Sequence, residues 1–219
     1  MPIPTRFIAQ INRNGGLVKE WVKRKQMTEF RAWIVLLTVP LLVVALFLWL
    51  APPRHNPFAP IDLTDKLGLG THAKLERART HREVCFSALD SAGILYTPLE
   101  DEPKGKKCGL RNALTLDRTL TPYSATLSMT CAETAALYTW ERHVARPAAV
   151  DILGSPLARI ETYGSYACRN IAGSGRLSEH AHANAVDISG FRLEDGRLID
   201  VKTHWKQGGP EAKFLKRVH

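Results

Sequence analysis

The sequence predicts an α+β domain, a small antiparallel sheet with flanking helices, preceded by one transmembrane helix. An uncharged apolar run, 32–51, has the length of about 20 residues that crosses a bilayer core. After this run, helical hydrophobic spacing comes first and alternating strand patterns come later, an order typical of the α+β class. The 219 residues, with 45% hydrophobic content, suffice for an anchor and one domain with a real core.

The apolar run reads AWIVLLTVPLLVVALFLWLA, with a tryptophan near each end, where amphipathic rings favour the membrane interface. Pro40 is tolerated because membrane helices accept proline. Arg54 stands nearly alone after the run, whereas several cations precede it: Lys19, Lys23, Arg24, Lys25 and Arg31. The positive-inside rule therefore predicts a basic cytoplasmic segment, 1–31, and a single-pass inner-membrane protein with a periplasmic C-terminal domain. Tryptophan and proline around Ala51 disfavour cleavage, so we expect an uncleaved anchor.

Residues 52–72 are rich in proline and lack periodicity, which predicts an extended periplasmic linker before a domain over 73–219. All four cysteines follow the anchor: Cys85, Cys108, Cys131 and Cys168. An even set in an oxidising compartment predicts disulfides, with three possible pairings among which spacing does not choose. A zinc finger is disfavoured because no Cys-x-x-Cys pair occurs.

The net charge of +9 is spread along the chain rather than gathered in one stripe. Nucleic-acid binding needs clustered cations with a groove-reading element, so we expect no nucleic-acid partner. A basic protein outside the membrane would favour anionic partners such as lipid head groups or cell-wall polymers.

The elements of the outer domain follow from hydrophobic spacing and turn residues. Gly93 ends the first helical pattern, and Asp195-Gly196 predicts a hairpin turn between the last two strands. The expected order is helix 73–92, strand 94–96, strand 110–116, helix 128–144, strand 158–163, loop 164–180, strand 184–191, strand 198–203 and helix 210–219.

The chemistry is expected around His180 and Asp187. A catalytic zinc site takes three histidine or carboxylate ligands and keeps one position for water. The loop ending in His180 would bring the imidazole to the end of the strand that carries Asp187, so that both side chains meet one ion. Spacing alone favours a surface histidine and a loop-capping aspartate.

The residues around this pair favour the metal site. The segment SEHAHANAVD, 178–187, resembles the Ser-x-His-x-x-Gly-x-Ala-x-Asp signature of the D-alanyl-D-alanine peptidases and their zinc peptidase relatives, which include lysostaphin-type endopeptidases and the hedgehog domain. Ala183 stands where glycine is usual, and SYACR, 165–169, resembles the upstream Tyr-Arg element. The chain more closely resembles the bacterial extensin-like C-terminal family over roughly 85–219, with Cys-Gly at Cys108, Thr-Cys-Ala at Cys131 and a later tryptophan in the same order.

The resemblance implies that His180 and Asp187 are zinc ligands and that Arg169 holds a substrate carboxylate or a developing oxyanion. In the alternative, Arg169 only pairs with Glu161 or Glu179. Glu179 could also serve as a general base, although nothing in the spacing requires it.

Other polar residues near the signature have simpler explanations. His182 is an additional ligand or a solvated residue, and the sequence favours the solvated one. Ser178 is expected to bond within the loop, because no G-x-S-x-G elbow surrounds it.

The resemblance also implies features that this sequence does not contain. In these families a later His-x-His segment supplies the third ligand, and extensin-like proteins carry a further Cys-Arg before it. Here only His204 and His219 remain downstream, without that context. We therefore expect a C-terminally truncated domain rather than one that has lost catalysis, and an odd thiol at Cys168.

Together these features predict a membrane-anchored zinc-peptidase-like protein that cuts peptide bonds in peptidoglycan, with Zn²⁺ as its cofactor. The alternative is a non-catalytic protein of the same fold that binds peptidoglycan or another envelope polymer, which the missing ligand favours. A binder of membrane surfaces or nucleic acid rests on charge alone and ranks last.

Overall fold

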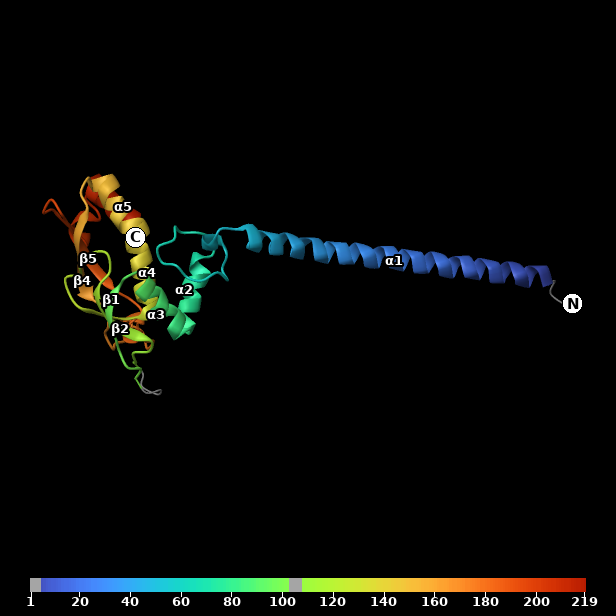
Figure 1. The fold of residues 1–219 in the computed structure, drawn as a ribbon, viewed down its shortest axis with the longest axis horizontal. Helices are drawn as coiled ribbons and strands as arrows, with labels where there is room; N and C mark the ends of the chain where they lie inside the picture. The colour runs from blue at the N-terminus through green and yellow to red at the C-terminus, as the bar shows by residue number, and fades with distance from the viewer. Residues whose placement is uncertain (1–4, 103–107) are drawn as a thin grey trace. The chain divides into compact units, whose positions relative to one another are not determined.

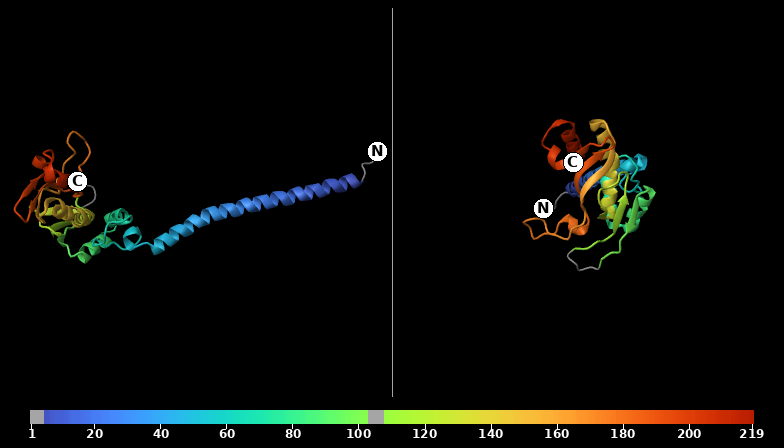
Figure 2. Two further views of the ribbon diagram at one scale, coloured as in Figure 1. Left: turned by 90° about the horizontal axis from the view of Figure 1, so that it is seen from above. Right: turned by 90° about the vertical axis from the view of Figure 1, so that its left-hand side faces the viewer.

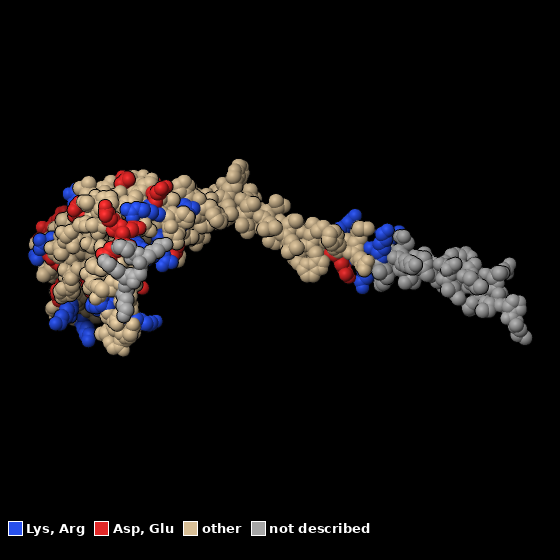
Figure 3. All heavy atoms as spheres, turned by 90° about the horizontal axis from the view of Figure 1, so that it is seen from below, with Lys and Arg blue, Asp and Glu red and all other residues tan. Residues whose placement is uncertain are grey.

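The structure, a computed structural model, describes residues 5–102 and 108–219, with side chains described from Lys23 onward. The chain divides into two compact units, Met1–Ala51 and Pro52–His219. Where the structure describes it, the first unit consists of one helix, α1 (Thr5–Leu50), drawn in blue in Figure 1. Its part Lys23–Leu50 is long and apolar enough to cross a membrane, and Figure 3 shows an uncharged stretch along it. One helix of this kind is confirmed; its orientation and compartment remain predictions.

The segment 52–72 is part of the second unit and packs into it instead of forming the expected extended linker. It begins with a short 3₁₀ turn, η1 (Pro53–His55), and buries Leu63 in the core. The Arg77 guanidinium donates hydrogen bonds to three carbonyls of this segment, those of Pro57, Phe58 and Ala59. These hydrogen bonds explain why the segment is not an extended linker. A proline-rich stretch without periodicity can still be fixed when a side chain from another element binds its carbonyl groups.

Glycine lets this segment fold back on itself. The Gly70 amide donates to the Arg54 carbonyl at 3.1 Å. A Cβ on Gly68 would collide with the Arg54 backbone, and one on Gly70 would lie 2.9 Å from the Asn56 carbonyl. Only glycine allows so close an approach of two backbones.

Two helices replace the single helix expected over 73–92. These are α2 (Thr71–Thr80) and α3 (Arg82–Ser91), separated by His81 in an extended conformation with φ −122° and ψ 94°. Side chains bond the backbone at this break: the Thr80 hydroxyl donates to the Arg77 carbonyl at 3.1 Å. Such local bonds offer the chain an alternative to continuing the helix.

The first sheet is antiparallel, with order β1-β2-β3. Its strands are β1 (Leu95–Pro98), β2 (Ala113–Arg118) and β3 (Leu127–Thr130). The expected helix start at 128 is wrong, because Leu127 and Met129 are buried on one face and continue the strand period. Helix α4 (Cys131–Trp140) begins directly after this strand.

A long helical run follows and contacts both halves of the unit. It consists of α4, η2 (Glu141–Ala145), α5 (Arg146–Ala148) and η3 (Ala149–Leu153), and it ends at Gly154 with φ 71°. In the right-hand view of Figure 2 this run, in yellow, lies between the green strands of the first sheet and the orange strands of the second. Glu141, fully buried on the run, accepts hydrogen bonds from the hydroxyls of Thr119 and Tyr123.

The second sheet is also antiparallel, with order β4-β5-β6. Its strands are β4 (Leu157–Gly164), β5 (Asp187–Leu193) and β6 (Leu198–Asp200). The predicted hairpin at Asp195-Gly196 is confirmed, but the last strand ends early because Asp200 caps a short helix, α6 (Val201–His204), through the Thr203 amide. Helix α7 (Gly209–Val218) agrees with the expected C-terminal helix.

The α+β class is therefore confirmed, with two small antiparallel sheets in place of one. Each sheet has its own hydrophobic cluster, and Tyr123 and Trp140 pack against both. The Trp140 indole donates to the Val218 carbonyl at 2.8 Å, and Phe191 meets Phe214 edge to face at 5.0 Å. These contacts join the helical run to α7 and the second sheet.

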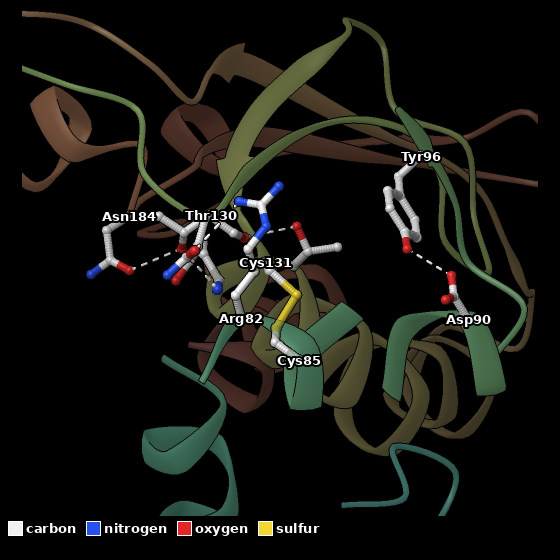
Figure 4. The surroundings of a disulfide bond; sticks show 10 residues. Arg82, Cys85, Asp90, Tyr96, Thr130, Cys131 and Asn184 are labelled. Atoms are coloured by element: carbon white, nitrogen blue, oxygen red, sulfur yellow. Dashed lines mark hydrogen bonds between the residues drawn. A yellow bond between two sulfur atoms is a disulfide. The ribbon is translucent and has the colours of Figure 1, made fainter. Parts of the chain in front are cut away.

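The disulfides are Cys85–Cys131 and Cys108–Cys168, so the expected odd thiol at Cys168 is wrong. The first bond joins α3 to the first residue of α4, as Figure 4 shows. The second joins the segment before β2 to the loop after β4. Spacing left three pairings open, and only the folded positions of the four cysteines select this one.

Candidate functional site

The candidate site is built on two chain segments, 165–170 and 177–182, that run side by side. The Ala167 amide donates to the His180 carbonyl at 3.0 Å, and the Ser178 amide donates to the Arg169 carbonyl at 3.1 Å. Ser178 is the N-cap of a 3₁₀ turn, η4 (Glu179–His182), and its hydroxyl accepts from the His180 amide. This agrees with the structural role expected for Ser178 and fixes the start of the turn that carries His180.

His180 and Asp187 converge as the sequence predicts. Their closest atoms, His180 Nε2 and Asp187 Oδ1, lie 3.4 Å apart. The His180 side chain is 13% exposed, while Asp187, the first residue of β5, is 54% exposed and open to solvent. The strand therefore delivers the carboxylate to the imidazole carried by the neighbouring turn.

The hydrogen bond of His180 Nδ1 determines what can lie between His180 Nε2 and the Asp187 carboxylate. His180 Nδ1 lies 2.7 Å from the Ser165 carbonyl oxygen, which only accepts, so Nδ1 carries the hydrogen. In a neutral ring the Nε2 lone pair then faces a carboxylate, which also only accepts. A proton or a metal ion must lie between them to make the contact favourable.

The distance between His180 Nε2 and Asp187 Oδ1 also fits two ligands of one zinc ion. Zinc binds histidine nitrogen at about 2.0–2.1 Å and carboxylate oxygen at about 2.0–2.2 Å, and tetrahedral angles then put two such ligands roughly 3.4 Å apart. Metal-binding histidines commonly donate their second ring N–H to a carbonyl, as His180 does to Ser165. These two residues therefore fit two corners of a zinc site.

A third ligand is not brought to this pair within the ranges 5–102 and 108–219, where no group of three His, Cys, Asp or Glu residues could hold a metal. His204 is bonded to the Asp200 backbone, and His219 packs on the Trp205 ring at 5.3 Å. His182 is exposed, as expected for a solvated residue.

The N-terminus of α4 holds the site loop from the other side. The Thr130 amide donates to the Ala183 carbonyl at 2.8 Å, and the Thr130 hydroxyl lies 3.5 Å from Asn184 Oδ1. Figure 4 shows Thr130 and Asn184 facing each other beside the Cys85–Cys131 bond. Ala183 itself is buried with φ 54°, a left-handed conformation that favours glycine, the residue usual there in the signature.

Glu133 is a site residue that the sequence reasoning missed. It is half-buried on the first turn of α4. Burial raises the pKa of its carboxyl, the charge of Glu179 raises it further, and His180 opposes both. The signal was the Thr-x-x-Glu pattern of a helix start, 130–133. The Thr130 amide donates to the Ala183 carbonyl, so Glu133 does not complete a capping box, and its carboxyl interacts electrostatically with Glu179 and His180.

Glu179 lies at the edge of an open cleft of about 510 Å³. Its Oε2 accepts from Asn184 Nδ2 at 2.9 Å. The cleft walls carry polar and basic groups from both sides of the unit: Arg79, Arg111, Asn112, Thr130, Glu179, His182 and Asn184. A cleft of this size can admit a peptide segment. Glu179 and His182 of the turn line it, whereas His180 and Asp187 are not among its lining residues.

Arg169 is exposed, and its guanidinium has no bonded partner in the described part of the chain. The two pairings considered for it do not occur: Glu161 binds Arg159 and Arg192, and Glu179 binds Asn184. The neighbouring Cys108–Cys168 bond fixes the loop that carries Arg169. An unpaired guanidinium on a fixed loop is suited to bind an anion.

Fold and site together define a disulfide-bonded α+β protein with one apolar N-terminal helix and a convergent histidine–aspartate pair. Residues 83–219 match the family described as "Extensin-like protein C-terminus", and the chain belongs to this family. No curated protein and no solved structure matches the chain.

Proposed function

We propose that the folded unit is a zinc-peptidase-like protein of the cell envelope that acts on the peptides of peptidoglycan. One observation supports the proposal: His180 Nε2 faces Asp187 Oδ1 at 3.4 Å while Nδ1 donates to the Ser165 carbonyl, an arrangement that fits two ligands of one zinc ion. Bound zinc would polarise the scissile carbonyl and lower the pKa of a bound water.

The residues of this chain have distinct roles in the proposal. His180 and Asp187 hold the ion, and the Ser165 carbonyl keeps the imidazole in the required tautomer. Arg169 binds a substrate carboxylate, which peptidoglycan peptides supply. Glu179 lies on the adjoining cleft, where it can accept a proton as a general base, and Asn184 orients its carboxylate.

The cellular location is part of the same proposal. The anchor α1 spans the inner membrane once, with the cations at 23–31 in the cytoplasm and the folded unit in the periplasm. Both disulfides are compatible with that compartment because it is oxidising.

The test is digestion of purified sacculi by the full chain in detergent with added zinc. We expect release of new amino groups, loss of that release in His180→Ala and Asp187→Ala, and little change in His72→Ala, an exposed histidine outside the cleft. If all three variants release amino groups as the parent chain does, the peptidase role is wrong.

A non-catalytic envelope protein is the second candidate, favoured by the absence of a third ligand among the described residues. It predicts that the full chain binds sacculi, releases no amino groups, and still binds after Asp187→Ala or chelation. Binding that disappears under either treatment would favour the metal-dependent role instead.

A further inference from the structure

A second polar cavity lies apart from His180 and Asp187, on the helical run. It has a volume of about 410 Å³ and is lined by Thr64, Lys66, Leu120, Arg142, His143 and Arg146. We call it the basic pocket, because three of its lining residues, Lys66, Arg142 and Arg146, have basic side chains and none is acidic. The proposed peptidase role uses none of these residues.

The three cations of the basic pocket have no carboxylate partner in the described ranges, since no ion pair there includes Lys66, Arg142 or Arg146. Arg142 and Arg146 are four residues apart on the helical run, where like charges repel. Asp62 and Asp65, close to Lys66 in sequence, act on Lys74, and the buried Glu141 carboxyl next to Arg142 accepts from the Thr119 and Tyr123 hydroxyls. The pocket thus gathers positive charge that a bound anion would offset.

The donors of the basic pocket are partly fixed in place. Arg146 Nη1 donates to the Leu120 carbonyl at 3.1 Å, which orients the guanidinium and leaves its other two nitrogens for a ligand. Arg142 Nη1 lies 3.4 Å from the Tyr138 hydroxyl. His143 Nε2 is buried without a hydrogen-bond partner. Guanidinium groups with free N–H donors suit the oxygen atoms of phosphate.

Few residues separate the end of α1 from the part of the folded unit that carries Lys66. Helix α1 ends at Leu50, and the Arg54 carbonyl is already bonded to Gly70 of the folded unit. Four residues reach at most roughly 14 Å when fully extended. Arg54 and Lys66 line one smaller cavity, so Lys66 lies close to this attachment point. If α1 spans a bilayer, the chain length from Leu50 to Arg54 limits how far the start of the folded unit can lie from the head groups.

We propose that the basic pocket binds the phosphate of anionic phospholipid head groups in the membrane that holds α1, and that this contact docks the folded unit on the membrane surface. The observations favour a lipid over a soluble phosphate because the pocket is open and the anchor supplies head groups at high local concentration.

The test uses the full chain in nanodiscs of zwitterionic lipid, with and without anionic phosphatidylglycerol, and measures amide hydrogen exchange. We expect anionic lipid to slow exchange in 62–66 and 141–147. The triple variant Lys66→Gln, Arg142→Gln, Arg146→Gln should return this protection to the zwitterionic level. The charge-matched control, Arg176→Gln, Lys202→Gln, Lys206→Gln, removes three exposed cations outside the pocket and should keep the protection.

Three outcomes would overturn the proposal. Equal loss in the two triple variants would mean general charge attraction. Protection by inorganic phosphate in zwitterionic discs, without protection by anionic lipid, would mean a soluble ligand. No protection by either would mean that the pocket binds neither. The readout does not depend on zinc or on hydrolysis, so failure of the peptidase role leaves it unaffected.

Discussion

At the scale of single residues, the sequence predicts the part of the site that rests on local geometry. His180 and Asp187 could be paired because a turn and a following strand bring residues seven apart together, and the structure places them 3.4 Å apart. Glu133 could not be added in the same way. It approaches Glu179 and His180 only because α4 packs against a loop far along the chain.

Tyr96 provides a pH-dependent prediction at this scale. Its hydroxyl donates to Asp90 at 2.6 Å, and burial, with Asp90 as a second cause, raises the Tyr96 pKa from 10.0 to about 12. Because the folded pKa exceeds the unfolded one, the neutral phenol stabilises the fold below pH 10, and this contribution disappears as pH rises from 10 to about 12.

Ultraviolet titration of the phenolate should show one tyrosine that ionises near pH 12 in the folded protein and near pH 10 in denaturant. Tyr96→Phe should remove that transition and weaken the fall of unfolding free energy over this range. Tyr163→Phe is the control, because that ring is 78% exposed. An unchanged profile in Tyr96→Phe would contradict the assignment.

At the scale of elements, the presence of a helix or strand was easier to predict than the residues at which it begins and ends. The helix starting at 128 and the unbroken helix over 73–92 were both wrong, and for related reasons. Thr130 ends a strand by capping α4, and a helix stops at His81, whose Nδ1 lies 3.0 Å from the Arg77 carbonyl oxygen. Both depend on which hydrogen bonds the folded chain makes, which hydrophobic spacing does not record.

The Thr130 cap can be tested directly. Its hydroxyl accepts from the Glu133 amide at 3.1 Å, so Thr130→Ala should lower the unfolding free energy by about 1 kcal/mol in denaturant titration. Thr130→Ser retains the hydroxyl and should lose much less. If the two variants lose equal stability, the cap is not the reason.

At the scale of the whole molecule, the sequence predicts the α+β class and one apolar helix but not the way distant parts join. Tyr123 and Trp140 pack against the hydrophobic clusters of both sheets, and helical spacing, which includes Trp140 in a predicted helix, does not show that it contacts both. The disulfide pairing and the folding of 52–72 onto the unit likewise depend on contacts between distant segments. Hydrophobic periodicity within one segment does not predict contacts between distant segments.

The Cys108–Cys168 bond joins residues 60 positions apart and should contribute up to about 4 kcal/mol by restricting the unfolded chain. Replacing both cysteines with serine should lower the unfolding free energy and speed amide exchange in 165–170. Replacing Cys85 and Cys131 should cost similar stability, because that bond closes a loop of comparable size, but leave exchange at 165–170 less affected. Equal exchange in both variants would contradict a specific role for Cys108–Cys168 in fixing the Arg169 loop.

The central claim is that His180 and Asp187 hold one cation between them. Calorimetric titration of the full chain in detergent with zinc tests it most directly, using metal-free protein at neutral pH. We expect zinc to bind, with affinity at least tenfold weaker in His180→Ala and in Asp187→Ala, and unchanged in His182→Ala. Absence of zinc binding, or equal affinity in all four proteins, would contradict the claim.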